Sequence, residues 1–347
     1  MSTVAGGESE SGKVDWRSQG GILLAALAVL VGAFFFWPGG EGPDDWEREF
    51  PNTDFAQRSI EFDEIDSDGA TRDSIPPIVD PRFIPAASAA DVGPLEPVLS
   101  IGINGDHRAY PLRILLWHEI VNDVVGGVPV LVSYCPLCNS GVVFDRRAGD
   151  EVLEFGNTGR LRNFDMVMYD KATESWWQQF LGEALMGELT GTRLEALPAR
   201  LESMQSFRKR APEGRVLVPN DVRARPYGTT PYVGMDSGAE PPGIARLKAA
   251  LPSGVRPLMR VIVVGEEAWT LDLVRDRGRI ESGDLAIDWT PGQNSIHDTR
   301  QISDGRDVGN VVVRRRVDQG FEDVPYDVSF AFAFAAFVPD GTLHWER

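Results

Sequence analysis

The chain of 347 residues is 42% hydrophobic and 25% charged, and it contains 36 glycines and 24 prolines. This composition is typical of a globular protein rich in turns and strands, and it argues against a helical bundle. The formal net charge of -18 argues against nucleic-acid binding, because phosphate recognition needs clustered lysine and arginine. It also argues against binding of the folded body to anionic lipid.

Residues 20–37 (GGILLAALAVLVGAFFFW) form an uncharged stretch of 18 residues. A helix of this length spans about 27 Å, close to the thickness of a bilayer core. Lys13 and Arg17 precede the stretch and acidic residues follow it, so the positive-inside rule predicts a cytoplasmic N-terminus. The alternative is a cleaved secretory signal, but bulky aromatic residues stand where a small-residue cleavage site is needed. We therefore expect a single-pass membrane protein with an extracytoplasmic body.

The predicted organisation follows from shifts in composition along the chain. We expect a cytoplasmic tail (1–19), a transmembrane anchor in the lipid bilayer (20–37), a flexible acidic linker (38–74), a first β-rich half with the cysteine pair (75–222), a loop (223–245) and a second, degenerate half (246–347). The predicted fold class is α+β and strand-rich, with two related halves packed into one body behind the transmembrane helix.

Within the first half, apolar patterning predicts these elements in chain order. Strands are expected at 97–103 and 107–112, a helix at 112–123 ended by Gly126–Gly127, strands at 128–134, 141–147, 151–157 and 165–170, a helix at 174–185 and a strand at 215–221. Residues 225–243 have the composition of a loop.

Three segments of the first half recur in the same order in the second. YCPLCNS (134–140) aligns with WTPGQNS (289–295), GDHRAYPL (105–112) with GEEAWTL (265–271), and GVVFDRR (141–147) with GNVVVRR (309–315). We interpret this as an internal duplication. Cys135 and Cys138 then align with Thr290 and Gln293. Because the second turn forms without sulfur, the cysteines of the first turn are interpreted as chemical rather than structural residues.

Cys135 and Cys138 are the chain's two cysteines, and three roles are open to them. A disulfide would close a very short loop, which stabilises a fold of this size little. Thiol–disulfide exchange is possible in an oxidising compartment, although a strand-like segment follows where thioredoxin-like proteins have a helix. Soft-metal binding requires further ligands.

A copper or zinc site would therefore need ligands in addition to the two thiols. The four histidines are His107, His118, His297 and His344, and His118 lies nearest to the cysteines in sequence. Met166 and Met168 would share one face of a strand, with core packing as the alternative for both. The competing function is a non-catalytic envelope module that binds a protein or small-molecule partner and uses the cysteines only structurally.

Long stretches of this chain resemble the family of proteins of unknown function numbered 3179. The matching segments are RAYPLRILLWHEIVNDVVGGVPVLVSYCPLCNSGVVFDRR, LEFGNTGRLRNFDMVMYD, ESWWQQFLGEALMGELTGTRL, PYVGMD and FAFAFAAFVPDGTL. The resemblance implies an extracytoplasmic, often membrane-anchored protein without a settled activity. Phe332, Phe334 and Val338 stand where the family pattern has tryptophan or histidine.

Several polar residues accompany the thiols in these segments, and we expect two or three of them to be functional. They are Arg113, His118, Glu119, Asn122, Asp123, Asn157, Asn163, Asp165, Asp170, Glu174 and Ser175, beside Trp176 and Trp177.

Overall fold

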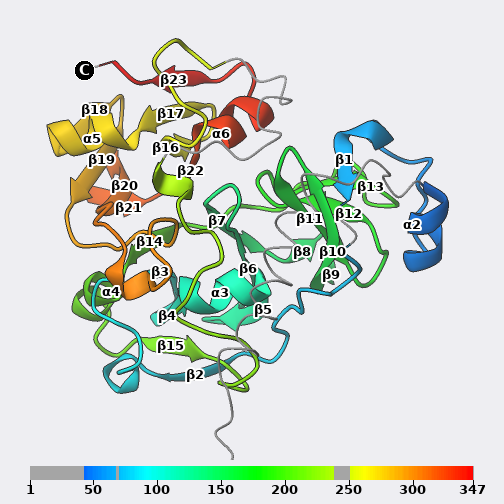
Figure 1. Cartoon of the computed structure of the whole chain (residues 1–347), viewed down its shortest axis with the longest axis horizontal. Coiled ribbons are helices and arrows are strands. Elements are labelled where there is room, and N and C mark those ends of the chain that lie inside the picture. Colours follow the sequence, from blue (N-terminus) through cyan, green and yellow to red (C-terminus); the bar gives the residue numbers. More distant parts are fainter. Residues whose placement is uncertain (1–42, 68–69, 238–250, 347) are drawn as a thin grey trace, which may run out of the picture. The chain divides into compact units, whose positions relative to one another are not determined.

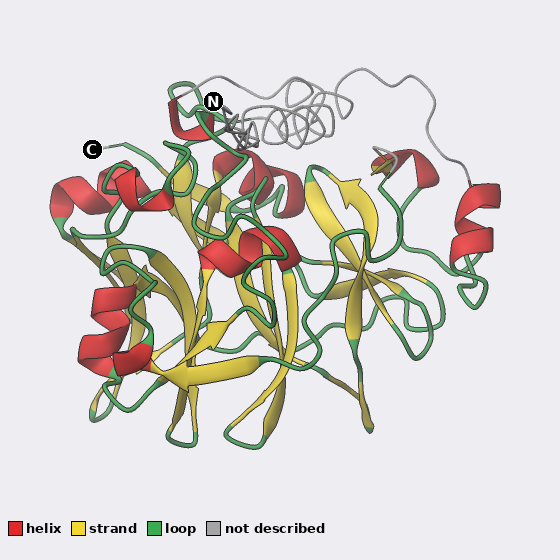
Figure 2. Ribbon diagram, turned by 60° about the horizontal axis from the view of Figure 1, so that its bottom comes forward, coloured by secondary structure: helices red, strands yellow, loops and turns green. Residues whose placement is uncertain are grey.

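The computed structural model describes residues 43–67, 70–237 and 251–346. In this part of the chain, five sheets of three to five strands form the blades of a five-bladed β-propeller (Figures 1 and 2). The expectation of an α+β body made of two halves is therefore wrong. Each α-helix described spans only seven residues, so strand pairing, not helix packing, determines the architecture.

The five blades, given in the order in which neighbouring strands pair, draw on distant parts of the chain. The first contains β1 (Ile65–Ser67), β10 (Phe155–Arg162), β11 (Asp165–Asp170), β12 (Trp176–Gln178) and β13 (Glu183–Met186). The second contains β14 (Ala199–Ser203), β3 (Pro97–Ile103), β4 (Asp106–Pro111), β15 (Arg215–Val218) and β2 (Arg82–Pro85). The third contains β5 (Ile120–Val125), β6 (Val128–Cys135) and β7 (Ser140–Asp145).

The C-terminal part of the chain supplies the other two blades. The fourth contains β22 (Asp327–Phe330), β16 (Arg260–Val264), β17 (Glu267–Thr270) and β23 (Thr342–His344). The fifth contains β18 (Arg279–Ser282), β19 (Leu285–Thr290), β20 (Asn310–Val317) and β21 (Gly320–Asp323). A separate hairpin joins β8 (Arg147–Ala148) to β9 (Glu151–Val152). The helices are α2 (Pro43–Glu49), α3 (Leu112–His118), α4 (Met204–Arg210), α5 (Leu271–Arg277) and α6 (Ala331–Phe337), with 3-10 turns at Phe62–Glu64, Ala86–Ser88, Met235–Ser237 and Ile302–Asp304.

Both helices expected in the first half need correction. The helix expected at 112–123 ends at His118, where Glu119 adopts a positive φ of 57°, and the β-branched run that follows forms β5. Gly126 and Gly127 both have positive φ and make the turn between β5 and β6, so they do not end a helix. The helix expected at 174–185 is the strand pair β12–β13.

The described part of the expected flexible linker belongs to the folded body. Its aromatic residues Trp46, Phe50 and Phe55 are buried and pack on Trp176, and β1 pairs with β10. The expected cytoplasmic tail and anchor (1–37) lie outside the described residues. Among the residues that are described, none of the helices has the length and apolarity needed to cross a bilayer.

The three aligned segment pairs do correspond element by element. β3, β4, α3, β5, β6 and β7 follow one another as β16, β17, α5, β18, β19 and β20 do. Each series supplies a hairpin to one blade and three strands to another. The series nevertheless do not form separate halves, because β22 of the fourth blade also lies against β7, and the blade around β10 and β11 has no counterpart.

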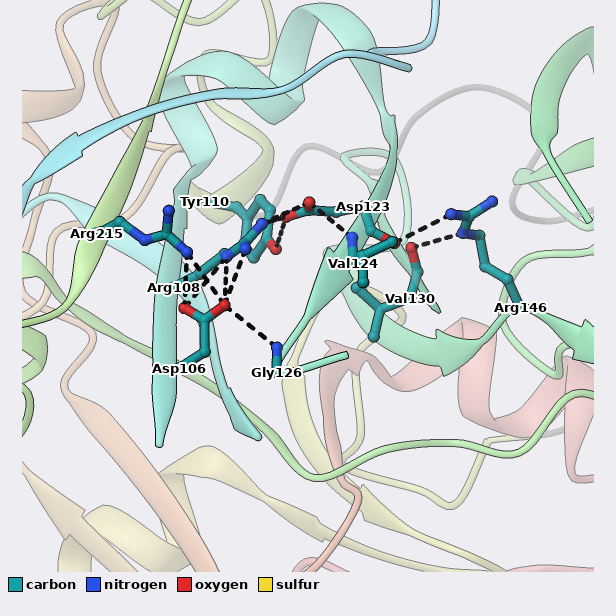
Figure 3. A network of polar contacts seen from close by, with 9 residues as sticks. All are labelled: Asp106, Arg108, Tyr110, Asp123, Val124, Gly126, Val130, Arg146 and Arg215. Atoms are coloured by element: carbon teal, nitrogen blue, oxygen red, sulfur yellow. Dashed lines mark hydrogen bonds and ion pairs between the residues drawn. The ribbon is translucent and has the colours of Figure 1, made fainter. Parts of the chain in front are cut away.

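A polar network joins the second and third blades (Figure 3). Arg108 on β4 contacts both carboxylate oxygens of Asp123 on β5, at 2.5 and 2.6 Å, and also binds Asp106. The Tyr110 hydroxyl donates to Asp123 at 2.6 Å. Because Asp123 and Arg108 are both shielded from solvent, each charge depends on the other for compensation. The network thus ties β4 of the second blade to β5 of the third.

Candidate metal centre

The turn between β6 and β7 places the two cysteines side by side. Cys135 is the last residue of β6 and pairs with Ser140, so Pro136 to Asn139 form the loop. Asn139 has a positive φ of 54°, its amide donates to Val328 O, and the Tyr134 hydroxyl donates to its carbonyl oxygen at 3.0 Å. The Phe330 amide donates to Cys138 O at 2.8 Å. Strand β22 therefore holds the turn from one side.

A second turn, between β10 and β11, lies against the two sulfur atoms. Asn163 and Phe164 form it with positive φ values of 51° and 63°. A positive φ is unfavourable for a bulky residue such as phenylalanine. This conformation places the Phe164 carbonyl oxygen 3.7 Å from Cys135 Sγ and 3.4 Å from Cys138 Sγ.

Asp165, the first residue of β11, supplies a carboxylate to the same place. One carboxylate oxygen and the two Sγ atoms all lie within 4.8 Å of one another, and all three residues are buried. Oδ2 of Asp165 accepts hydrogen bonds from Gln178 Nε2 at 2.6 Å and from the Phe180 amide at 2.9 Å. Oδ1 is buried and has no such partner in the described part of the chain. These two donors therefore orient the carboxylate.

The spacing between the Phe164 carbonyl oxygen and the two sulfurs is close to that in a tetrahedral zinc site. With zinc–sulfur bonds of about 2.3 Å and zinc–oxygen bonds of about 2.1 Å, sulfur and oxygen ligands are separated by about 3.6 Å. The two distances from Phe164 O to the sulfurs, 3.4 and 3.7 Å, bracket that value. The same distances also allow two protonated thiols to donate to the carbonyl, which is the structural alternative.

Burial and neighbouring carboxylates keep both thiols protonated in the absence of a cation. Burial raises the pKa of Cys135, and the negative charges of Asp165 and Glu119 raise it further. The pKa of Cys138 is raised well above its usual value by burial, by Cys135 and by the charges of Asp165 and Asp327. Burial also raises the pKa of Asp165 to about 7, although the hydrogen bonds from Phe180 and Gln178 lower it. A bound cation would reverse all three effects.

His118, the histidine predicted as a ligand, contacts groups other than the thiols. Its Nδ1 is 2.8 Å from Pro76 O and its Nε2 is 2.9 Å from the Tyr227 hydroxyl, and burial lowers its pKa. Among the described residues, the carboxylate that groups with the thiols belongs to Asp165.

Met166 and Met168 are buried in the same apolar cluster as the two cysteines. Met166 Sδ lies 3.9 Å from Asn157 Nδ2, and this amide also donates to Glu119 at 2.6 Å. Both methionines thus face the thiol side of β11, while Val167 between them packs in a different cluster. Their role as ligands stays a prediction.

Three groups around the turn were not predicted as site components. Asp165 was noted only as a polar residue at a strand end, and the Phe164 carbonyl carries no side-chain signal at all. His297 lies in the long loop after β19, yet its Nε2 donates to Pro136 O at 2.8 Å. The aligned segment NSIHD could have indicated this loop, because it continues the WTPGQNS turn.

Other polar residues from the matching segments serve the fold. Asn122 exchanges hydrogen bonds with the Phe155 backbone, and Asp170 accepts from Trp177 Nε1 and from Thr173. Glu174 pairs with Arg72 at 2.6 Å. These contacts hold β5, β10 and β12 in place.

Comparison with protein families agrees with the resemblance seen in the sequence. The family described as "Protein of unknown function (DUF3179)" matches residues 72–341, which include the complete thiol site. Comparison with curated proteins gave no match, and comparison with solved structures gave none either. The matched range covers most of the chain and every blade strand except β1 and β23, and on this basis the protein belongs to the DUF3179 family.

Proposed function

We propose that the protein binds one thiophilic metal ion through Cys135 Sγ, Cys138 Sγ, the Asp165 carboxylate and the Phe164 carbonyl oxygen. The observation that carries this proposal is the convergence of two thiols and a buried carboxylate within 4.8 Å. An isolated buried carboxylate is costly unless a cation or several donors compensate it. A metal ion would compensate Asp165 and deprotonate both thiols at once.

Zinc suits this donor set better than copper(I). Two sulfurs and two oxygens match the tetrahedral coordination that zinc prefers, whereas copper(I) prefers sulfur ligands alone. A copper(I) ion would instead recruit the thioether of Met166, which lies in the same cluster. The choice of copper or zinc therefore depends on whether Met166 or Asp165 completes the site.

Thiol–disulfide exchange receives less support from the geometry. An attacking thiol must be accessible and partly ionised. Here Cys135 and Cys138 are only 1% and 0% exposed, and burial raises the pKa of both. The non-catalytic module remains the alternative if no metal binds.

A competition titration distinguishes the two metals. The purified full chain, reduced and freed of metal, is titrated with zinc and with copper(I) against chelators of known affinity. We expect one zinc ion per chain, unchanged affinity in Met166→Leu and a loss of affinity in Asp165→Asn. The reverse pattern, with Met166 required and Asp165 dispensable, would indicate copper(I). Binding of neither ion would contradict the proposal.

We also propose that residues 20–37 anchor the chain in a bilayer and that the body is extracytoplasmic. The support is the uncharged stretch itself and the excess of basic residues before it. Protease added to intact cells or spheroplasts that express the full chain should digest the body while a cytoplasmic marker survives. Protection of the body until the membrane is permeabilised would contradict this topology.

A further inference from the structure

The thiol site is covered by a segment that is not part of any sheet. Residues 230–236, here called the strap, consist of loop and the first part of a 3-10 turn. Four backbone hydrogen bonds hold the strap. Thr230 donates to Arg300 O at 3.0 Å, Gly234 donates to His297 O at 2.8 Å and to Asp298 O at 3.3 Å, and Asp236 donates to His297 O at 3.3 Å. Val233 at its tip is 51% exposed. Such segments open at lower free energy than sheets do.

The strap is connected to the cysteine turn through His297 and Phe330. The His297 ring is fully buried, it donates to Pro136 O between the two cysteines, and it lies 5.1 Å from the Phe330 ring. Tyr232 of the strap contacts the same imidazole edge to face. Met235 of the strap packs on the apolar cluster that contains both cysteines. The strap therefore forms an outer layer over the residues that seal the turn.

Asp236 is the polar anchor of the strap. Its carboxylate is 1% exposed and contacts Arg260 Nη2 at 3.2 Å, Arg306 Nε at 3.4 Å and the Ser295 hydroxyl. Arg260 Nη2 also donates to Ser295 Oγ at 2.9 Å and to His297 Nδ1 at 3.2 Å. One carboxylate thus ties the strap to the layer that contacts the cysteine turn. Removing a single partner from a buried ion pair leaves an uncompensated charge, which strongly favours opening.

Three aromatic residues of the cluster that contains the thiols lie in a hairpin turn or in regular elements. Phe164 lies in the β10–β11 turn, Phe330 is the last residue of β22 and Phe332 lies in α6. Displacing any of these would disrupt a hairpin, strand pairing or a helix, whereas opening of the strap breaks no strand pairing. We propose that opening of the strap, with Asp236 as its latch, admits ions and small reagents to Cys135 and Cys138. The identity of the admitted ion rests on the proposed function. The accessibility of the thiols does not.

Thiol accessibility in the metal-free protein tests the latch. The probe is 4,4′-dithiodipyridine, a small neutral disulfide that reacts with accessible thiols and releases a chromophore. We expect Asp236→Asn to increase the labelling rate of the reduced full chain by about tenfold or more, because the buried ion pairs are lost. Arg306→Ala removes one exposed partner of Asp236 and should give a smaller increase.

Asp123→Asn is the matched control. It breaks another buried arginine–aspartate pair, in the network of Figure 3, which joins β4 to β5 and includes no residue of the strap. This variant should be less stable globally. At low urea, its labelling rate should stay within about twofold of the wild-type rate. The labelling rate of Asp236→Asn should depend little on urea concentration, because local opening itself depends little on urea.

The outcomes separate the two proposals. Unchanged labelling in both Asp236→Asn and Arg306→Ala would overturn the latch, and so would equal acceleration in Asp123→Asn. If Asp236→Asn does not fold, the result for Arg306→Ala alone decides. Zinc release from loaded protein to a chelator should follow the labelling rates. A chain that binds no zinc but still shows faster labelling retains the latch and loses the metal site.

Discussion

Replacing Cys135 by serine is expected to weaken zinc binding more than about 100-fold, to a level at which the purified chain retains no stoichiometric ion. Loss of a residue that only supports a metal ligand already lowers affinity by about 10–100-fold, and loss of a thiolate ligand removes more. The serine hydroxyl can still donate to Phe164 O, the contact that the thiol makes at 3.7 Å. The fold should therefore persist, and Cys138→Ser should behave in the same way.

His118→Ala is the control for this experiment. His118 was the histidine predicted as a third ligand, but both of its ring nitrogens contact other groups, Pro76 O and the Tyr227 hydroxyl. Its removal should change zinc affinity by less than about twofold while costing some stability. Affinity is measured by chelator competition and folding by denaturant titration. Full zinc binding by Cys135→Ser, or a large loss in His118→Ala, would show that the ligand set is wrong.

Asp165→Asn is expected to have opposite effects on the metal-free and the zinc-loaded protein. Burial raises the pKa of Asp165 to about 7 in the folded chain, against an unfolded value near 3.9. Between pH 4 and pH 7 the folded state therefore binds a proton that the unfolded state has lost. Stability falls as the pH rises through this range and levels off above pH 7, and the full effect is about 4 kcal/mol.

The asparagine variant lacks this penalty but can still accept the hydrogen bonds from Gln178 and Phe180. Without metal, it should be more stable than the wild type at pH 8 and similar near pH 4. With zinc at pH 8, the wild type should gain stability and the variant should not. Thermal unfolding from pH 4 to pH 8, with zinc or with chelator, measures both effects. Asp327, whose pKa burial raises to about 6, titrates in both proteins, and its negative charge contributes to the raised pKa of Asp165 in the wild type. A metal-free variant less stable than the wild type at pH 8 would instead give Asp165 a purely structural role.

Local patterns predicted the strands of this fold better than they predicted its architecture. The runs around β3, β4, β6, β7 and β11 were recognised because β-branched apolar runs and the Asn104–Gly105 turn are local signals, whereas Gly126–Gly127 was mistaken for the end of a helix. The helix expected at 112–123 failed because one unfavourable φ at Glu119 ends α3 and starts β5. The arrangement of blades could not be predicted, since β22 joins β16 and β15 joins β4 across long sequence separations.

The candidate site was predictable only in part for the same reason. The cysteine turn follows directly from the sequence. The aligned strand β19 ends at Thr290, where β6 ends at Cys135, so a strand of this kind can end without sulfur. Asp165 and the Phe164 carbonyl come from a different blade, and only strand pairing and blade packing bring them to the thiols. A backbone oxygen as a ligand leaves no trace in residue type.

X-ray absorption spectroscopy at the zinc edge, on the full chain loaded with one equivalent of zinc, tests the coordination directly. We expect two sulfur neighbours at about 2.3 Å and two oxygen neighbours at about 2.0–2.2 Å, with no imidazole scattering. A zinc ion without sulfur neighbours, or a chain that retains no zinc after loading, would contradict the account.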